Sequence, residues 1–118
     1  MIQATIKMNL SPEKIDETIN ILRSIVQRTR VEAGCISCSV YLDTENKNTI
    51  IFEQKWRSNE DLKRYLRSED YQKVLLIVEM ADTKPEIRFD TITDSSGVET
   101  IEKARRKNGN AILELEDD

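Results

Sequence analysis

The order in which two hydrophobic periodicities follow one another is the feature that most constrains this fold. Apolar side chains alternate with polar ones in four segments, and they recur every three or four residues in the segments between them. In chain order these segments are a strand at 2–9, a helix at about 12–32, strands at 35–43 and 48–56, a helical region at 59–78 and a strand at 86–93. The β-α-β-β-α-β order predicts an α+β, ferredoxin-like fold with a four-stranded antiparallel sheet and both helices on one sheet face.

Serine and glycine residues mark the expected helix ends. Ser11 should cap the first helix, because a serine hydroxyl can accept a hydrogen bond from a free backbone N–H at a helix start. Gly34 should end that helix in the left-handed conformation. Ser58 with Asp61 forms a capping-box pattern that opens the second helix, and Ser68 is expected to cap a further turn or helix.

The composition changes after Asp94, which divides the chain into two parts. Residues 1–94 are predicted to be one ferredoxin-like domain, and residues 95–118 a helical or extended C-terminal tail. Within the tail, residues 98–104 are a short amphipathic helix candidate, and residues 111–118 read either as an added strand or as an acidic tail. We expect the tail to lie over a partner subunit or to be partly disordered.

The charge and hydropathy of the chain exclude several classes of partner. A net charge of −4 argues against nucleic acid, since phosphate binding needs a basic surface. No apolar run approaches the roughly 20 residues that a membrane span requires, and the N-terminus does not resemble a signal peptide. The sequence therefore predicts a cytoplasmic protein that binds neither membrane nor nucleic acid.

Cys35 and Cys38, the two cysteines, have the C-x-x-C spacing of redox and metal sites. On a regular strand they would point to opposite sheet faces with their Cα atoms about 10 Å apart, too far for a disulfide. A zinc site would need further soft ligands, and the chain has no histidine and no other cysteine. We predict that both cysteines are packing residues and that the protein has no metal site.

The strand at 48–56 carries apolar side chains toward both faces of the expected sheet. Ile50, Phe52 and Trp56 share one face, whereas Ile51 points to the other. A monomer would leave the second face in water. The pattern predicts a homodimer that packs the bare sheet faces together.

Two segments, TRVEAGCISCSVY (29–41) and IIFEQKWRSNEDLKRYLRSEDY (50–71), resemble the antibiotic biosynthesis monooxygenase family. The matching features are the glycine turn at Gly34, Trp56 at the end of its strand and Ser58 opening the next helix. The resemblance covers residues 1 to about 94. It implies that ferredoxin-like domains pair sheet to sheet into a dimeric α/β barrel.

The resemblance also implies a function, the oxidation of quinols and other electron-rich phenols with O₂ and no metal, flavin or other cofactor. This sequence departs from the family at two places. Tyr65 stands where relatives often have histidine, and Phe52 stands where polyketide-tailoring members carry asparagine. The haem-degrading branch uses an axial histidine, which this chain lacks.

The candidate site follows from the resemblance and lies in a cleft between sheet and helices. Catalytic roles are assigned to Trp56, Tyr65 and Tyr71, and a small aromatic substrate is expected to contact Gln54, Phe52, Leu62 and Leu66. Such a site needs an enclosed cavity beside Trp56 on the order of 300 Å³. The same residues can equally form a plain core, so the alternative is a non-catalytic dimeric module that binds a ligand or serves a structural role.

Overall fold

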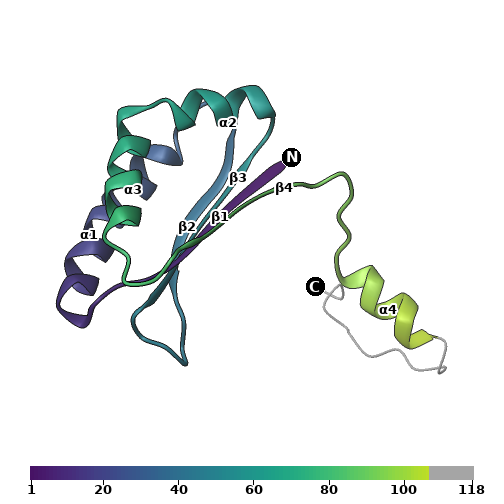
Figure 1. The fold of residues 1–118 in the computed structure, drawn as a ribbon. Coiled ribbons are helices and arrows are strands. Elements are labelled where there is room, and N and C mark those ends of the chain that lie inside the picture. The colour runs from purple at the N-terminus through teal and green to yellow at the C-terminus, as the bar shows by residue number, and fades with distance from the viewer. Residues whose placement is uncertain (107–118) are drawn as a thin grey trace.

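A computed structural model describes residues 1–106 and contains the predicted four-stranded antiparallel sheet. Its strands are β1 (Ile2–Asn9), β2 (Cys35–Leu42), β3 (Thr49–Trp56) and β4 (Glu86–Thr91), in the spatial order β2-β3-β1-β4. The helices α1 (Pro12–Thr29), α2 (Asn59–Leu66) and α3 (Glu69–Glu79) cover one face of this sheet (Figure 1). The predicted α+β ferredoxin-like arrangement is confirmed.

The core lies between the two central strands and the helices. On β1 and β3, paired residues on the helix-facing side stack in register, as Ile6 does opposite Phe52 and Met8 opposite Ile50. These side chains are buried against apolar residues of α1 and α3, chiefly Leu22, Ile25, Val26, Val74 and Ile77. Alternation on the strands and helical spacing on the helices therefore meet in a single apolar layer.

Two expectations about helix ends are wrong and two are confirmed. Helix α1 ends at Thr29 rather than near residue 32, and Gly34 lies in the turn that follows instead of ending the helix. The Ser11 side chain makes no capping hydrogen bond, and its buried hydroxyl has no partner among the described residues. The hydroxyls of Ser58 and Ser68 accept hydrogen bonds from the third residue beyond each, as predicted.

Gly34 has a φ of +84°, so it needs a conformation that other residues adopt at an energetic cost. A Cβ atom at this position would also overlap the Asp61 side chain. We expect Gly34→Ala to lower the free energy of unfolding by about 1–3 kcal/mol in urea denaturation. Gly97→Ala is the matched control, because its Cβ would meet only the flexible end of Glu99. Equal stability of the two variants would contradict this account of Gly34.

A β-bulge at Ile36 corrects the predicted orientation of the cysteines. Cys35 pairs with Trp56 and Cys38 with Gln54. Two residues, Ile36 and Ser37, separate the cysteines on β2, whereas only Lys55 separates their partners on β3. The extra residue puts both cysteines on the helix-facing side, where regular strand parity would have separated them. Both are free thiols, Cys38 buried and Cys35 partly buried.

The edge strand β4 and the last described helix, α4 (Val98–Arg106), stand outside the core. On β4, Ile87 and Phe89 point to the helix side, but no helix covers them and they are 43% and 49% exposed. Helix α4 projects away from the sheet and its helices, and none of its residues is buried (Figure 1). The part of the predicted tail at 111–118 lies outside the described residues. Within residues 1–106, no helix combines the length and apolar character of a membrane span.

Candidate functional site

The structure gathers all seven predicted site residues into one region between the sheet and α2 and α3. They come from β3 (Phe52, Gln54, Trp56), from α2 (Leu62, Tyr65, Leu66) and from the first turn of α3 (Tyr71). Alternation on β3 places its three residues on the same face, and helical spacing turns Leu62, Tyr65 and Leu66 toward that face.

The three aromatic side chains form a continuous stack. The Trp56 and Tyr65 rings lie 4.9 Å apart between centroids, and the Tyr65 and Tyr71 rings meet edge to face at 5.6 Å. Trp56 is only 1% exposed. The indole therefore belongs to the packed core.

A buried hydrogen-bond network joins the same residues to β2. The Trp56 indole N–H donates to Gln54 Oε1 over 3.1 Å, and Gln54 Nε2 donates to Cys38 Sγ over 3.6 Å. The Thr29 hydroxyl donates to the Ile25 carbonyl over 2.7 Å and lies 3.0 Å from the Tyr65 hydroxyl. Each polar group of this network thus has a partner, which offsets the free energy lost on leaving water.

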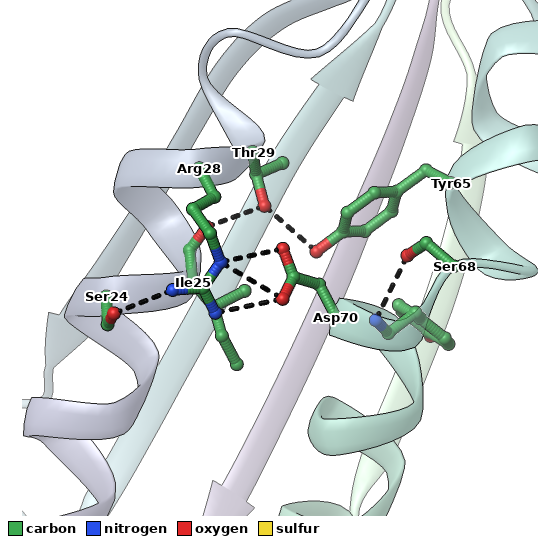
Figure 2. A network of polar contacts seen from close by, with 8 residues as sticks. Ser24, Ile25, Arg28, Thr29, Tyr65, Ser68 and Asp70 are labelled. Carbon is green, nitrogen blue, oxygen red and sulfur yellow. Dashed lines mark hydrogen bonds and ion pairs between the residues drawn. The ribbon is translucent and has the colours of Figure 1, made fainter.

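Helix α3 is tied to α1 beside this network, as Figure 2 shows. The Arg28 guanidinium makes a bidentate ion pair with Asp70 at 2.9–3.1 Å, and it also donates to Ser24. The hydrogen bond to Asp70 raises the pKa of Arg28. Because Tyr71 directly follows Asp70, this pair helps to orient the start of α3 over the sheet.

Burial controls the ionisation of the Tyr65 and Tyr71 hydroxyls and of the Cys38 thiol. It raises the pKa of Tyr65 to about 12 and that of Cys38 to about 11, against ordinary values of 10.0 and 9.0. Burial alone raises the pKa of Tyr71. At neutral pH both tyrosines are therefore protonated, so each can donate a hydrogen bond but cannot act as a general base.

The space beside Trp56 is much smaller than the predicted aromatic site would require. A shallow hollow of about 80 Å³ is lined by Trp56 and Tyr65 together with Glu32, Asp61 and Arg64. Benzene needs a cavity of about 150 Å³, so this hollow cannot hold an aromatic ring. The cavity of about 300 Å³ that the oxygenase site would need is therefore not found beside Trp56 among residues 1–106, because the Tyr65 ring and the Gln54 amide pack around the indole.

A second space lies between α3 and the uncovered strand β4, and we call it the α3–β4 groove. It is lined by Ala4, Thr5, Ile6, Phe52, Gln54, Tyr71, Ile87 and Phe89. The volume of this space is only about 10 Å³, too small for an aromatic ring, so a ring could lie only against the exposed side chains of Ile87 and Phe89 at its rim. Three predicted site residues reach this groove, namely Phe52, Gln54 and Tyr71, whereas Leu62 and Leu66 line neither space.

Sequence reasoning missed several residues of this region. Ile87 and Phe89 lie directly opposite Ile6 and Ala4 in the sheet register, so alternation on β4 already indicated a shared face. The sequence did not indicate that the helix layer leaves the β4 edge of the sheet uncovered. Cys38 was read as packing alone, although its sulfur also accepts a hydrogen bond from Gln54.

The open sheet face holds a larger hollow, outside the predicted site. This space of about 280 Å³ is lined mainly by polar and charged residues of β1, β3 and β4, including Lys7, Glu53 and Arg88. A further polar hollow of about 300 Å³ lies near Asn9 and Lys84. Among residues 1–106, no group of three or more His, Cys, Asp or Glu side chains could hold a metal ion.

The fold and the groove define a ferredoxin-like α+β domain with an aromatic-lined region between sheet and helices, and comparisons with known proteins identify its family. The model of the antibiotic biosynthesis monooxygenase family matches residues 1–75. This chain belongs to that family.

Individual proteins share the fold or part of the sequence. A conserved protein from Methanosarcina mazei superposes with a TM-score of 0.70 at 29% identity, covering 75% of this chain and 89% of that one. A structure described as an antibiotic biosynthesis monooxygenase shares the fold, with a TM-score of 0.71 at 20% identity over 80% of this chain and 100% of that one. The Synechocystis protein sll1783 is 33% identical over 51 residues, which are 43% of this chain and 35% of that protein.

Proposed function

We propose that this protein is a cofactor-independent monooxygenase that oxidises a quinol or similar small aromatic held against the open rim of the α3–β4 groove, at Ile87 and Phe89. The observation that carries the proposal is an exposed apolar rim, formed by Ile87 and Phe89, beside a groove whose lining includes Tyr71 and the buried Gln54. Phe89 offers an exposed aromatic wall, and Tyr71 offers a hydroxyl whose pKa is perturbed by burial alone. Family membership supports the oxygenase chemistry.

The reaction balances without any added reductant. A quinol and O₂ give a hydroxyquinone and water, with one oxygen atom entering the ring, the other leaving as water, and the substrate supplying all the electrons. The substrate must lose a proton to become electron-rich enough to react. Since both nearby tyrosines are protonated at neutral pH, the substrate phenolate has to form by ionisation in solution, and Tyr71 then stabilises its oxygen by donating a hydrogen bond.

Oxygen uptake with a panel of quinols tests the proposal. We expect one O₂ consumed per quinol, with a rate that rises with pH as the quinol ionises. Phe89→Ala should raise KM roughly three- to tenfold by removing an aromatic contact. Tyr71→Phe should lower kcat roughly ten- to a hundredfold by removing the hydrogen-bond donor. Ile36→Ala, an exposed position on β2 at the other edge of the sheet, is the matched control and should leave both constants unchanged.

A second candidate function is a ligand-binding module of the same fold that performs no oxidation. The full packing around Trp56 and the protonated state of Tyr65 favour it, because neither residue can reach a substrate or accept a proton at neutral pH. Quinol binding without oxygen uptake above the protein-free rate would establish this alternative. Absence of both binding and uptake would refute an aromatic ligand altogether.

We also propose that two copies pair through the open faces of their sheets, as the family resemblance implies. On that face Tyr41 and Ile51 lie directly opposite each other on β2 and β3 and form an apolar patch. Charged side chains of both signs surround it, including Glu53 and Arg88. A two-fold axis can pair such opposite charges across the interface while it buries the patch.

A further inference from the structure

Helix α4 has the properties of a segment that packs against another surface. Val98 and Ile101 lie one turn apart on the same side, and Ile101 is 48% exposed. An isolated helix of nine residues is marginally stable in water, so most of its stability must come from packing. None of its residues is buried against the described part of the chain.

The path of the chain carries α4 away from its own domain. The Ile92 N–H donates to the Met1 carbonyl over 2.8 Å, which prolongs the pairing of β4 with β1 beyond Thr91. The chain then continues outward to α4 (Figure 1). The radius of gyration is 17.7 Å, whereas a compact chain of this length has about 13 Å.

The rim of the α3–β4 groove is an apolar surface of matching character that lacks a cover. Ile87 and Phe89 form one wall, and Leu75, one turn beyond Tyr71 on α3, is also exposed. A third helix over β4 would complete the helix layer that α1 and α3 begin. Within residues 1–106, α4 therefore has no supporting surface and the β4 edge of the sheet has no covering helix.

We propose that α4 of a second copy lies over the rim of the α3–β4 groove, with Ile101 against Phe89, and so forms the outer wall of the ligand site. The inference rests on the proposed function for the role of the groove, and it assigns the missing wall to the partner. In a two-fold dimer the exchange is reciprocal, so both helices and both grooves are covered at once. The site of each subunit is then incomplete without the other.

Disulfide cross-linking between two differently tagged chains tests this arrangement without any use of activity. Full-length Ile101→Cys with a tag is mixed with untagged Phe89→Cys and oxidised. We expect a covalent species with the summed mass of the two chains, since both positions are exposed and the proposal brings them into contact. Replacing Phe89→Cys by Ile36→Cys, an exposed position on the opposite sheet edge, should abolish that species. Val98→Cys with Ile87→Cys provides a second pair.

Four outcomes are distinguishable. The cross-linked species of summed mass, together with a dimer in native mass spectrometry, supports the exchange. An internal disulfide in the chain that carries both Ile101→Cys and Phe89→Cys, without cross-linking between chains, overturns it in favour of α4 folding onto its own groove. No disulfide of either kind for both pairs also overturns it. Absence of quinol oxidation by the wild-type protein, alongside cross-linking between the cysteine variants, would count against the proposed function only.

Discussion

Replacing Trp56 with alanine is expected to lower the free energy of unfolding by about 3–5 kcal/mol, because the side chain is buried and its removal leaves a large cavity. Trp56→Phe keeps an aromatic ring against Tyr65 but removes the N–H that donates to Gln54. The phenylalanine variant should lose about 1–3 kcal/mol. Urea denaturation followed by far-ultraviolet circular dichroism measures both, since the only tryptophan of the chain is lost as a fluorescent probe.

Phe89→Ala serves as the control for this experiment, because the Phe89 side chain is half-exposed at the sheet edge. We expect that variant to lose much less stability than Trp56→Ala. A Trp56→Ala protein within about 1 kcal/mol of the wild type would contradict the packed environment described for the indole. The expected instability also explains why Tyr71 and Phe89, rather than Trp56, are the positions that test catalysis.

Alkaline pH should lower the free energy of unfolding, because two buried side chains must lose their protons. Tyr65 and Cys38 have pKa values of about 12 and 11 when folded, against 10.0 and 9.0 ordinarily, so the folded state holds their protons more tightly than the unfolded state. The stability from this difference is complete below pH 9 and is lost as the pH rises toward 12. By thermodynamic linkage, each pKa difference corresponds to a loss of roughly 2–3 kcal/mol in the free energy of unfolding.

Urea denaturation at several pH values between 8 and about 11 measures this loss. Tyr65→Phe should show a shallower decline with pH, although it starts from a lower stability because the hydrogen bond to Thr29 is gone. Tyr41→Phe removes an exposed hydroxyl and should keep the wild-type decline. If Tyr65→Phe declined as steeply as Tyr41→Phe, the buried phenol would not be a source of the pH dependence.

The fold could be predicted from the sequence because its signals are local and repeated. Alternation in β1 and β3 and the helical stripe of α1 each specify one buried face, and only a few topologies bring those faces together. The capping serines Ser58 and Ser68 act within three residues, so their roles were also readable. The end of α1 could not be predicted in this way, because the turn from Thr29 to Gly34 depends on how β2 meets β3.

The candidate site was only partly predictable, for a physical reason. Residue type and face indicated that Phe52, Gln54 and Tyr71 would meet, and they do. Whether aromatic side chains enclose a cavity or fill it depends on distances of an ångström or two, such as the 4.9 Å between the rings of Trp56 and Tyr65. Sequence patterns carry no information at that scale.

The bulge at Ile36 has a consequence for the solubility of the protein. It lies on β2, a free edge of the sheet, where unpaired N–H and C=O groups could recruit a strand from another molecule. An extra residue bends the edge and interrupts the regular spacing that an incoming strand would need. Deleting Ile36 would make the pairing of Cys35, Ser37 and Cys38 with β3 regular, leave both cysteines on the helix-facing side and give the chain a straighter, more aggregation-prone edge.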